Sequence, residues 1–309
     1  MTQTASAFVL GTAMWGWTIN PTDCHRILDT YYERGGRWID GATNYPINKK
    51  GSDFRKAEQI LLDWINSRGV DDLKIIMKVG SVNNLGGPEN NLSPSFLLLC
   101  AQEYQHLFGQ QLASLMIHWD NRTNLEEIQA SLDTLIVVEG VSLGLSGVRH
   151  PDIYAEALEN RKVKEVWLQL KHNVIYSDYN RYAPLHDNAR CIAYGINAGG
   201  LKLDAKAYSK QASLLARGGN HEQHKELVEG LIGLIDRFSA ANNRPALKKM
   251  NHIGLLYALL HPGIEKVLLG VSKVEQLEDS LAWEQVLNQY DYSDWFAALG
   301  KIIVKHGKK

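Results

Sequence analysis

Short runs of apolar and β-branched residues alternate along the chain with segments in which apolar residues recur every three or four positions. The first pattern is typical of buried strands, and the second is typical of amphipathic helices. This alternation predicts a parallel sheet built from strand–helix units. The predicted strands are Phe8–Leu10, Arg37–Asp40, Lys74–Lys78, Ser114–His118, Val141–Leu145, Glu165–Leu170, Cys191–Tyr194 and Lys266–Leu269.

Segments with helical spacing separate most of these strands, and several of them begin beside a proline, which suits the first turn of a helix. Eight strands with helices on the outside would close into a barrel. We therefore expect one α/β domain over residues 1–309, a (β/α)8 TIM barrel. The predicted helices are Thr22–Arg34, Phe54–Arg68, Pro94–Phe108, Asn124–Val137, Pro151–Glu159, Tyr179–His186 and Val274–Leu287.

The stretch before the last strand, from about 197 to 262, is too long for a single connection. Its pattern predicts a loop followed by the helices Glu222–Ala241 and Ala246–Leu260. We expect an insertion or long loop around residues 197–245. At the C-terminus, Lys305–Lys309 is expected to be a frayed tail.

The charges nearly cancel, with 33 basic and 34 acidic residues giving a net charge of -1. No overall field attracts nucleic acid or an anionic membrane, so a small-molecule ligand is expected. Cys24, Cys100 and Cys191 are odd in number and far apart, which argues against a disulfide framework or a zinc site and fits a reducing cytoplasm. Neither a signal peptide nor an apolar stretch of ~18 to 20 residues is apparent, so neither export nor membrane insertion is expected.

Three ionisable residues end three consecutive predicted strands: Asp40, Lys78 and His118. The carboxyl ends of barrel strands meet at one mouth, where active sites are built. Taken singly, such residues more often cap a helix, face solvent or fill a core. Grouped in an apolar mouth, they would be costly unless they pair, and pairing shifts pKa values in ways that catalysis uses.

Tyr45 lies five positions beyond Asp40, in a loop that can turn back over the mouth. A free phenol has a pKa of about 10, and a nearby Lys78 ammonium would lower it by stabilising the phenolate. Asp40 would keep Lys78 charged, and His118 would orient a substrate carbonyl. The four side chains indicate carbonyl reduction with Tyr45 as the general acid.

The segments that carry these residues resemble the aldo-keto reductase superfamily, and the likeness extends across almost the whole chain. The resemblance implies an NAD(P)-dependent reductase with Asp40, Tyr45, Lys78 and His118 as catalytic residues. The matching segments include Leu10–Thr12, Trp38–Tyr45, Ile75–Gly80, Leu115–Asp120, Leu143–Gly147, Gln169–Asn173 and Leu269–Ser280.

The same resemblance implies a cofactor site across the barrel mouth. Ser146 and Gln169 would hold the nicotinamide carboxamide, and Tyr194 would stack on the nicotinamide ring. The segment after the last strand would hold the adenosine end. The implied cofactor residues are Gly11, Thr12, Ser146, Gln169, Tyr194, Gly195, Gly270, Ser272, Lys273, Gln276 and Asp279.

The chain departs from the family pattern at several cofactor positions. Gly147 and Ser280 stand where the family usually has Asn, and Gly270 and Gln276 replace the basic pair that often grips a 2′-phosphate. Lys273 is expected to be the only nearby cation. Because a 2′-phosphate is normally met by Arg or Lys, NADPH is expected only narrowly ahead of NADH.

Trp15, Trp17 and Trp119 fall beside strand ends, where they are expected either to line the substrate pocket or to close the core. The polar loop Pro46–Lys50 favours a sugar-like carbonyl as the partner molecule. Two alternatives remain: a catalytically weak, nicotinamide-binding regulatory subunit of the same fold, and a lyase or isomerase that uses Lys78 for Schiff-base chemistry.

Overall fold

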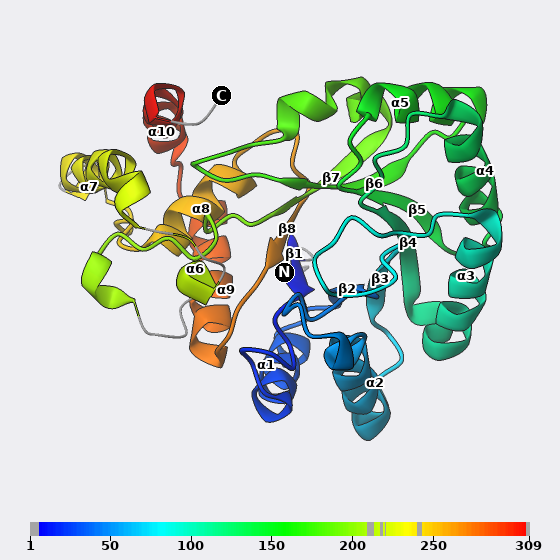
Figure 1. The fold of residues 1–309 in the computed structure, drawn as a ribbon. Coiled ribbons are helices and arrows are strands. Elements are labelled where there is room, and N and C mark those ends of the chain that lie inside the picture. Colours follow the sequence, from blue (N-terminus) through cyan, green and yellow to red (C-terminus); the bar gives the residue numbers. More distant parts are fainter. Residues whose placement is uncertain (1–5, 209–212, 217–218, 220, 240–242, 307–309) are drawn as a thin grey trace.

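Eight parallel strands close into a barrel in chain order, which confirms the predicted single-domain (β/α)8 fold (Figure 1). The computed structural model describes residues 6–208, 213–216, 219, 221–239 and 243–306. All eight predicted strands are present, with ends displaced by at most two residues. They are β1 Phe8–Gly11, β2 Trp38–Ala42, β3 Lys74–Val79, β4 Leu112–His118, β5 Ser142–Ser146, β6 Val166–Lys171, β7 Ala189–Tyr194 and β8 Lys266–Leu269.

The barrel interior is organised in two layers. An apolar cluster of Val9, Ile76, Met116, Trp167 and Ile192 fills the lower part. Because side chains two positions apart on a strand share a face, the residues two positions further along also point inward, at the mouth. The successive inward pairs are Trp38 and Asp40, Ile76 and Lys78, Met116 and His118, Trp167 and Gln169, and Ile192 and Tyr194.

Helices cover the outside of the barrel (Figure 1). Connections after β1 to β5 each contain one helix of at least ten residues. The α-helices are α1 Pro21–Glu33, α2 Lys56–Arg68, α3 Pro94–Phe108, α4 Leu125–Ile136, α5 Pro151–Asn160, α6 Ser213–Ala216, α7 Lys225–Ser239, α8 Met250–Leu259, α9 Val274–Gln289 and α10 Ser293–His306. Short 3-10 helices are η1 Gly51–Asp53, η2 Gly109–Gln111, η3 Tyr179–Asn188, η4 Ala205–Ala207 and η5 Glu222–His224.

Two helix predictions need correction. The segment expected to form a helix over Tyr179–His186 is the 3-10 helix η3, which contains Pro184, a residue without a backbone donor. Helix α8 begins at Met250 rather than at Ala246. The preceding backbone is held instead against the start of α10, because Pro245 O accepts from Tyr292 Oη at 2.5 Å.

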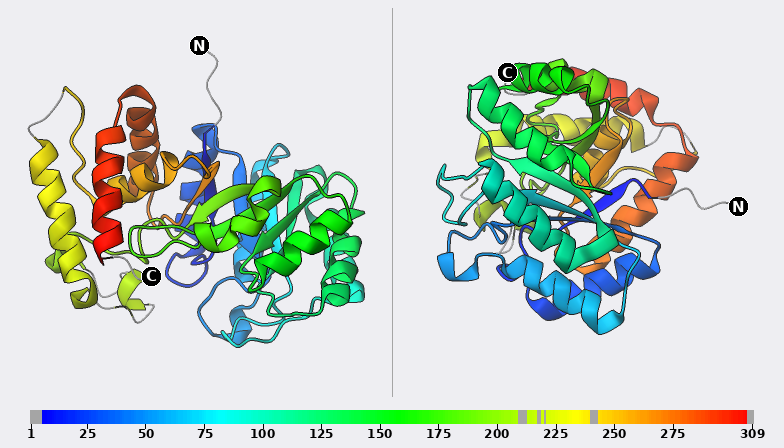
Figure 2. Two further views of the ribbon diagram at one scale, coloured as in Figure 1. Left: turned by 90° about the horizontal axis from the view of Figure 1, so that it is seen from above. Right: turned by 90° about the vertical axis from the view of Figure 1, so that its right-hand side faces the viewer.

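The chain between β7 and β8 contains α6, α7 and α8, and helix α10 follows α9 at the C-terminus. Helices α7 and α10 pack side by side beyond α8, with the rings of Phe238 and Trp295 5.3 Å apart (Figure 2). Helix α10 includes residues 305 and 306, so the predicted tail is wrong there, and 307–309 lie outside the described residues. Residues 240 and 241, which end the helix predicted over Glu222–Ala241, also lie outside the described residues. The insertion around 197–245 stays a prediction.

Cys24, Cys100 and Cys191 are buried free thiols. Within the described ranges, no helix is long and apolar enough to cross a membrane.

Gly144 makes room for the apolar layer from β5. A Cβ atom at this position would lie 2.3 Å from Met116 Cγ. We expect Gly144→Ala to lower the free energy of unfolding by about 1–3 kcal/mol, the usual range for an overpacked core. Urea denaturation measures this change. Gly300→Ala, in helix α10 with no atom within 4 Å of the added carbon, is the control and should not destabilise. Equal midpoints for both variants would contradict the tight fit.

Candidate active site

The predicted reactive residues meet in the upper layer of the barrel. Backbone register places His118, Ser146 and Gln169 at one level, because His118 pairs with Ser146 and Ser146 pairs with Gln169. Asp40 and Lys78 approach from β2 and β3, the two strands that precede β4 in the barrel. All five side chains are buried. The barrel thus gathers polar groups from five strands above an apolar floor.

An ion pair between Lys78 and Asp40 lies at the centre of this layer. Lys78 Nζ is 2.6 Å from Asp40 Oδ1 and 2.5 Å from Oδ2, and each residue is only 1% exposed. Burial lowers the pKa of Lys78, and the Asp40 carboxylate opposes that shift. Gln169 Nε2 also donates to Asp40 Oδ1, at 2.5 Å. The carboxylate therefore receives donors from both β3 and β6.

Tyr45 lies over the ion pair, with Lys78 Nζ 4.9 Å from the centre of its ring. Its loop is fastened from two sides. The backbone oxygen of Tyr45 accepts from Ala57 N at the start of α2, and Asn84 Nδ2, from the loop after β3, donates to Pro46 O at 3.1 Å. These bonds hold the phenol beside the ammonium, as predicted from the residue order.

His118 is fully enclosed at the end of β4. Burial, and secondarily the Lys78 charge, holds the pKa of its imidazole well below 6.5, so the ring is neutral at neutral pH. Its Nδ1 atom is buried without a hydrogen-bond partner among the described residues. A buried polar atom normally has a hydrogen-bond partner. An unpartnered one at the mouth of the barrel is therefore a candidate to bind a ligand.

Trp119 follows His118 in a left-handed conformation, with φ of 59°. Its backbone is held in place, since Trp119 N donates to Ser146 O and Trp119 O accepts from Asn90 Nδ2. The indole lies against Gly147, where a Cβ atom would be 2.4 Å from Trp119 Cδ1. Gly147, which departs from the family pattern, thus lies against the Trp119 indole, and a larger side chain at position 147 would collide with that ring.

The remaining predicted residues near the nicotinamide end lie at the mouth. Thr12 N and Oγ1 both donate to Asp40 O, so Thr12 fixes the backbone of β2. Gly11 pairs with Asp40 in the sheet. Tyr194 ends β7, and Gly195 follows it with φ of 69° while its oxygen accepts from Asn173 Nδ2.

The predicted adenosine segment is held by its own side chains. Gln276 Oε1 accepts from Ser272 N at 2.8 Å and from Ser272 Oγ at 3.1 Å, so the amide already occupies a backbone donor before α9. Gly270 has open space around it, and Lys273 caps the helix as an exposed residue.

Lys249 corrects the expectation that Lys273 is the only nearby cation. Its Nζ lies 2.7 Å from Asp279 Oδ1, and His252 Nε2 is 3.1 Å from Asp279 Oδ2. Lys249 lies 30 positions before Asp279 in the chain, and no local motif connects them. The packing of α8 against α9 brings the two residues together.

The three tryptophans differ in exposure. Trp15 is completely buried in the core, whereas Trp17 is 36% and Trp119 is 43% exposed.

In the nearby polar loop, Asn48 already binds Asp53, Asn84 and the backbone of Lys50. The polar groups of Asn48 are therefore engaged in hydrogen bonds that hold this loop and its neighbours in place.

Sequence reasoning missed the anchor below Trp119. Asp120 is 1% exposed and accepts hydrogen bonds from the Arg122 guanidinium at 2.8 Å and from Tyr154 Oη at 2.6 Å. Arg149 N also donates to Asp120 O. An acidic residue directly after a strand end was the available signal, but its distant partner Tyr154 was not evident from spacing.

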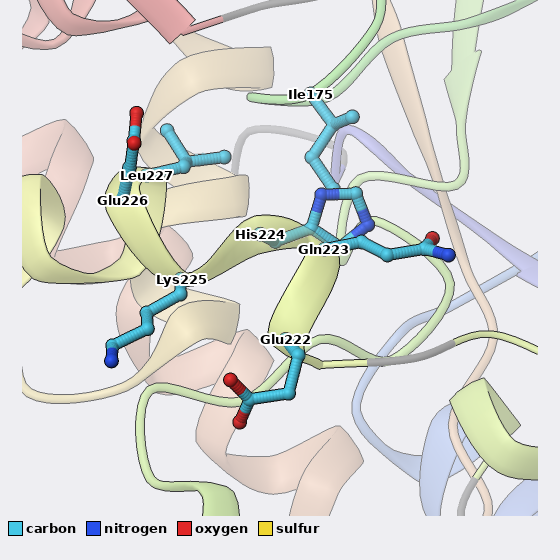
Figure 3. A pocket seen from close by; sticks show the side chains of 7 residues that line it. All are labelled: Ile175, Glu222, Gln223, His224, Lys225, Glu226 and Leu227. Atoms are coloured by element: carbon cyan, nitrogen blue, oxygen red, sulfur yellow. The ribbon is translucent and has the colours of Figure 1, made fainter.

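A separate pocket of about 340 Å³ lies between Ile175 and the segment Glu222–Leu227 (Figure 3). None of the predicted site residues lines it. Among the residues with described positions, no cluster of three or more His, Cys, Asp or Glu side chains is arranged to hold a metal ion.

Comparisons with known proteins agree with this geometry. The norsolorinic acid reductase of Emericella nidulans is 31% identical over 158 residues, covering 46% of this chain and 39% of that protein. A putative aryl-alcohol dehydrogenase of Saccharomyces cerevisiae is 24% identical over 159 residues, covering 48% of this chain and 72% of that protein. This chain thus aligns with less than half the length of the first relative.

A sequence profile of the Aldo/keto reductase family matches residues 7–299, which is nearly the whole described barrel. The chain therefore belongs to the aldo/keto reductase family, a family of NAD(P)-dependent oxidoreductases.

Proposed function

We propose that the protein reduces an aldehyde or ketone to an alcohol with a nicotinamide cofactor, and that Tyr45 donates the proton. The observation that carries this proposal is the Lys78 ammonium, which is bound to Asp40 at 2.5 Å and lies 4.9 Å from the Tyr45 ring. An ammonium beside a phenol favours the phenolate and so makes the phenol a stronger acid.

A reduced nicotinamide, when bound at this mouth, would supply the hydride for the carbonyl carbon and would itself be oxidised. The Tyr45 hydroxyl would give its proton to the carbonyl oxygen as that oxygen gains charge, and Lys78 would stabilise the resulting phenolate. Hydride and proton together would convert the carbonyl to an alcohol. In the reverse direction, the Tyr45 phenolate would accept the proton of an alcohol.

His118 has a different task, because a neutral imidazole beside the mouth can donate a hydrogen bond without being an acid. Its low pKa keeps it neutral near Lys78. The Nδ1 atom that lacks a partner among the described residues is one of two ring positions from which a carbonyl oxygen could be oriented. Asp40, Lys78 and His118 are buried, whereas Tyr45 is half-buried, so the proposed donor is the member of the group that a substrate could reach.

The residues present fit a nicotinamide at this mouth. The unpartnered His118 nitrogen and the aligned side chains of Ser146 and Gln169 support this, because they give the mouth polar groups with which the nicotinamide end could form hydrogen bonds. We place NADPH ahead of NADH because Lys249 and Lys273 both lie at the α8–α9 side of the predicted adenosine segment. Against this, Ser272 N is already bound to Gln276.

The substrate is a small carbonyl compound. The yeast relative is a putative aryl-alcohol dehydrogenase, which supports the same reaction class. A sugar-like carbonyl, suggested by Pro46–Lys50, draws less support, because Asn48 is bound within its own loop. Trp17 and Trp119 remain the exposed aromatic candidates for substrate contact.

The two alternatives predict different geometry. A regulatory subunit with little turnover has no need of a phenol beside a buried ammonium. A Schiff-base enzyme needs a Lys78 amine that can reach a carbonyl, but this nitrogen is bound to both oxygens of Asp40. The oxidoreductase hypothesis accounts for both the contact between Tyr45 and Lys78 and the ion pair between Lys78 and Asp40.

Tyr45→Phe tests the proposed acid. It should retain NADPH binding and lose carbonyl reduction by about 10²- to 10⁴-fold, the usual range for a positioned acid. Steady-state turnover of a panel of aldehydes and ketones, together with a fluorescence titration, separates the two effects. Unchanged turnover would overturn the role of Tyr45. Tyr290→Phe is the matched control, because this half-buried tyrosine follows α9 and lies outside the predicted site.

Cofactor choice can be measured by quenching of tryptophan fluorescence with NADPH and NADH. We expect tighter binding of NADPH, and Lys273→Ala should weaken it about three- to tenfold without affecting NADH, because an exposed cation contributes roughly 1 kcal/mol. Lys301→Ala, on the exposed surface of α10, should change neither. Equal affinities for NADPH and NADH would show that no cation of the protein binds the 2′-phosphate.

His118 should make the fold sensitive to mild acid. Its pKa is far below 6.5 in the folded protein, whereas the unfolded chain takes up the proton near pH 6.5, so stability falls as pH decreases through that value. Between pH 7.5 and 5.5 this residue should cost about 1.4 kcal/mol. In urea unfolding, His118→Gln should lose that much less than the wild type over the same interval; an identical loss would refute the buried neutral state.

A further inference from the structure

The side chain of Gln169 reaches across the barrel interior. It starts on β6 and ends on Asp40 of β2, with Nε2 2.5 Å from Oδ1. Gln169 is 2% exposed and Asp40 is 1% exposed, so neither can exchange this bond for water. A hydrogen bond from a buried amide to a carboxylate is stronger than one between neutral groups. The contact is therefore part of the charged centre.

Asp40 shares its carboxylate between two donors. Its Oδ1 accepts from both Lys78 Nζ and Gln169 Nε2, while Oδ2 accepts from Lys78. The two donors come from different strands, β3 and β6. Without the Gln169 hydrogen bond, the carboxylate would interact with Lys78 alone and would offset more of the ammonium charge.

We propose that Gln169 is a positioning residue for the proton donor, because it shares the Asp40 carboxylate with Lys78 and so leaves ammonium charge directed at Tyr45. This inference rests on the proposed function, in which Tyr45 donates the proton. It goes beyond a contact to the nicotinamide, for which one amide hydrogen and the carbonyl oxygen of Gln169 remain. One side chain would thus connect cofactor occupancy to the proton-donating group.

The groups around Tyr45 allow the effect of Gln169 to be measured through the titration of Tyr45. Lys78 Nζ lies 4.9 Å from its ring and is bound to Asp40, and Tyr194 of β7 interacts electrostatically with Tyr45. Burial lowers the pKa of His118 and raises that of Tyr194, so neither carries charge near neutral pH. The Asp40–Lys78 pair thus places an ammonium charge directly beside the phenol. A change in how Asp40 is held should therefore move the titration of Tyr45.

The experiment is a pH profile of the single-turnover hydride-transfer rate, with saturating NADPH and a carbonyl substrate that the wild-type protein reduces. Reduction requires the protonated phenol, so the rate falls at high pH as Tyr45 ionises. In Gln169→Met, which keeps the length of the side chain and removes the donor, this basic limb should move upward by about half to one pH unit, the equivalent of one hydrogen bond.

Ser146→Ala is the matched control, because Ser146 pairs with Gln169 in the sheet and is also predicted to meet the carboxamide, but no hydrogen bond joins it to Asp40. It should weaken NADPH binding and leave the profile in place. If Gln169→Met behaves like Ser146→Ala, with weaker binding and an unmoved basic limb, the positioning role is overturned. Gln169→Leu serves as the second variant should Gln169→Met not fold by circular dichroism.

Failure of the proposed function would look different. If the wild-type protein reduces no carbonyl compound, the phenolate absorbance difference between wild type and Tyr45→Phe still gives the titration of Tyr45 without turnover. The same difference measured in the Gln169→Met background should lie at higher pH. Coincident titrations would sink the positioning role independently of any activity.

Discussion

The buried ion pair between Lys78 and Asp40 is the interaction on which the rest of the site depends. Removing two charges from water costs several kcal/mol for each ion, and only good geometry with further hydrogen bonds offsets that cost. Here the carboxylate receives three contacts from two residues, and the ammonium lies under an aromatic ring. Stability alone does not account for a charged pair in this position, since an apolar pair of similar volume would fill the same space without the cost of removing charges from water.

The pair can exist because the barrel provides a floor for it. Five strands, β2, β3, β4, β6 and β7, each place an apolar residue in the lower layer and a polar one two positions later, so a single register sets both the packing of the floor and the position of the polar groups. Met116 and His118 illustrate this on β4, and Trp167 and Gln169 on β6. A shift of one residue in any strand would turn its polar group outward and its apolar group away from the floor.

Sequence reasoning predicted the strands, which the structure confirms, and placed Asp40, Tyr45, Lys78 and His118 at one end of the barrel, because both follow from local patterns: apolar runs, and polar residues at or just beyond their ends. The catalytic roles of the four residues stay a prediction. Sequence reasoning failed where the deciding contact is remote. Gln169 and Asp40 are 129 positions apart, and Lys249 reaches Asp279 only through the packing of two helices. The 3-10 form of η3 depends on Pro184 within an otherwise helical pattern, and α10 has the amphipathic spacing that we had assigned to no element.

Trp119 and Gly147 form a pair of positions that cannot change independently. The indole occupies the space of a side chain at 147, and both residues have left-handed backbones on neighbouring strand ends. Evolution away from this arrangement requires a smaller residue at 119 before a larger one appears at 147, because the reverse order passes through a collision. The two positions should covary among close relatives, so that a glycine after the β5 serine marks a lineage with a bulky residue after the β4 histidine.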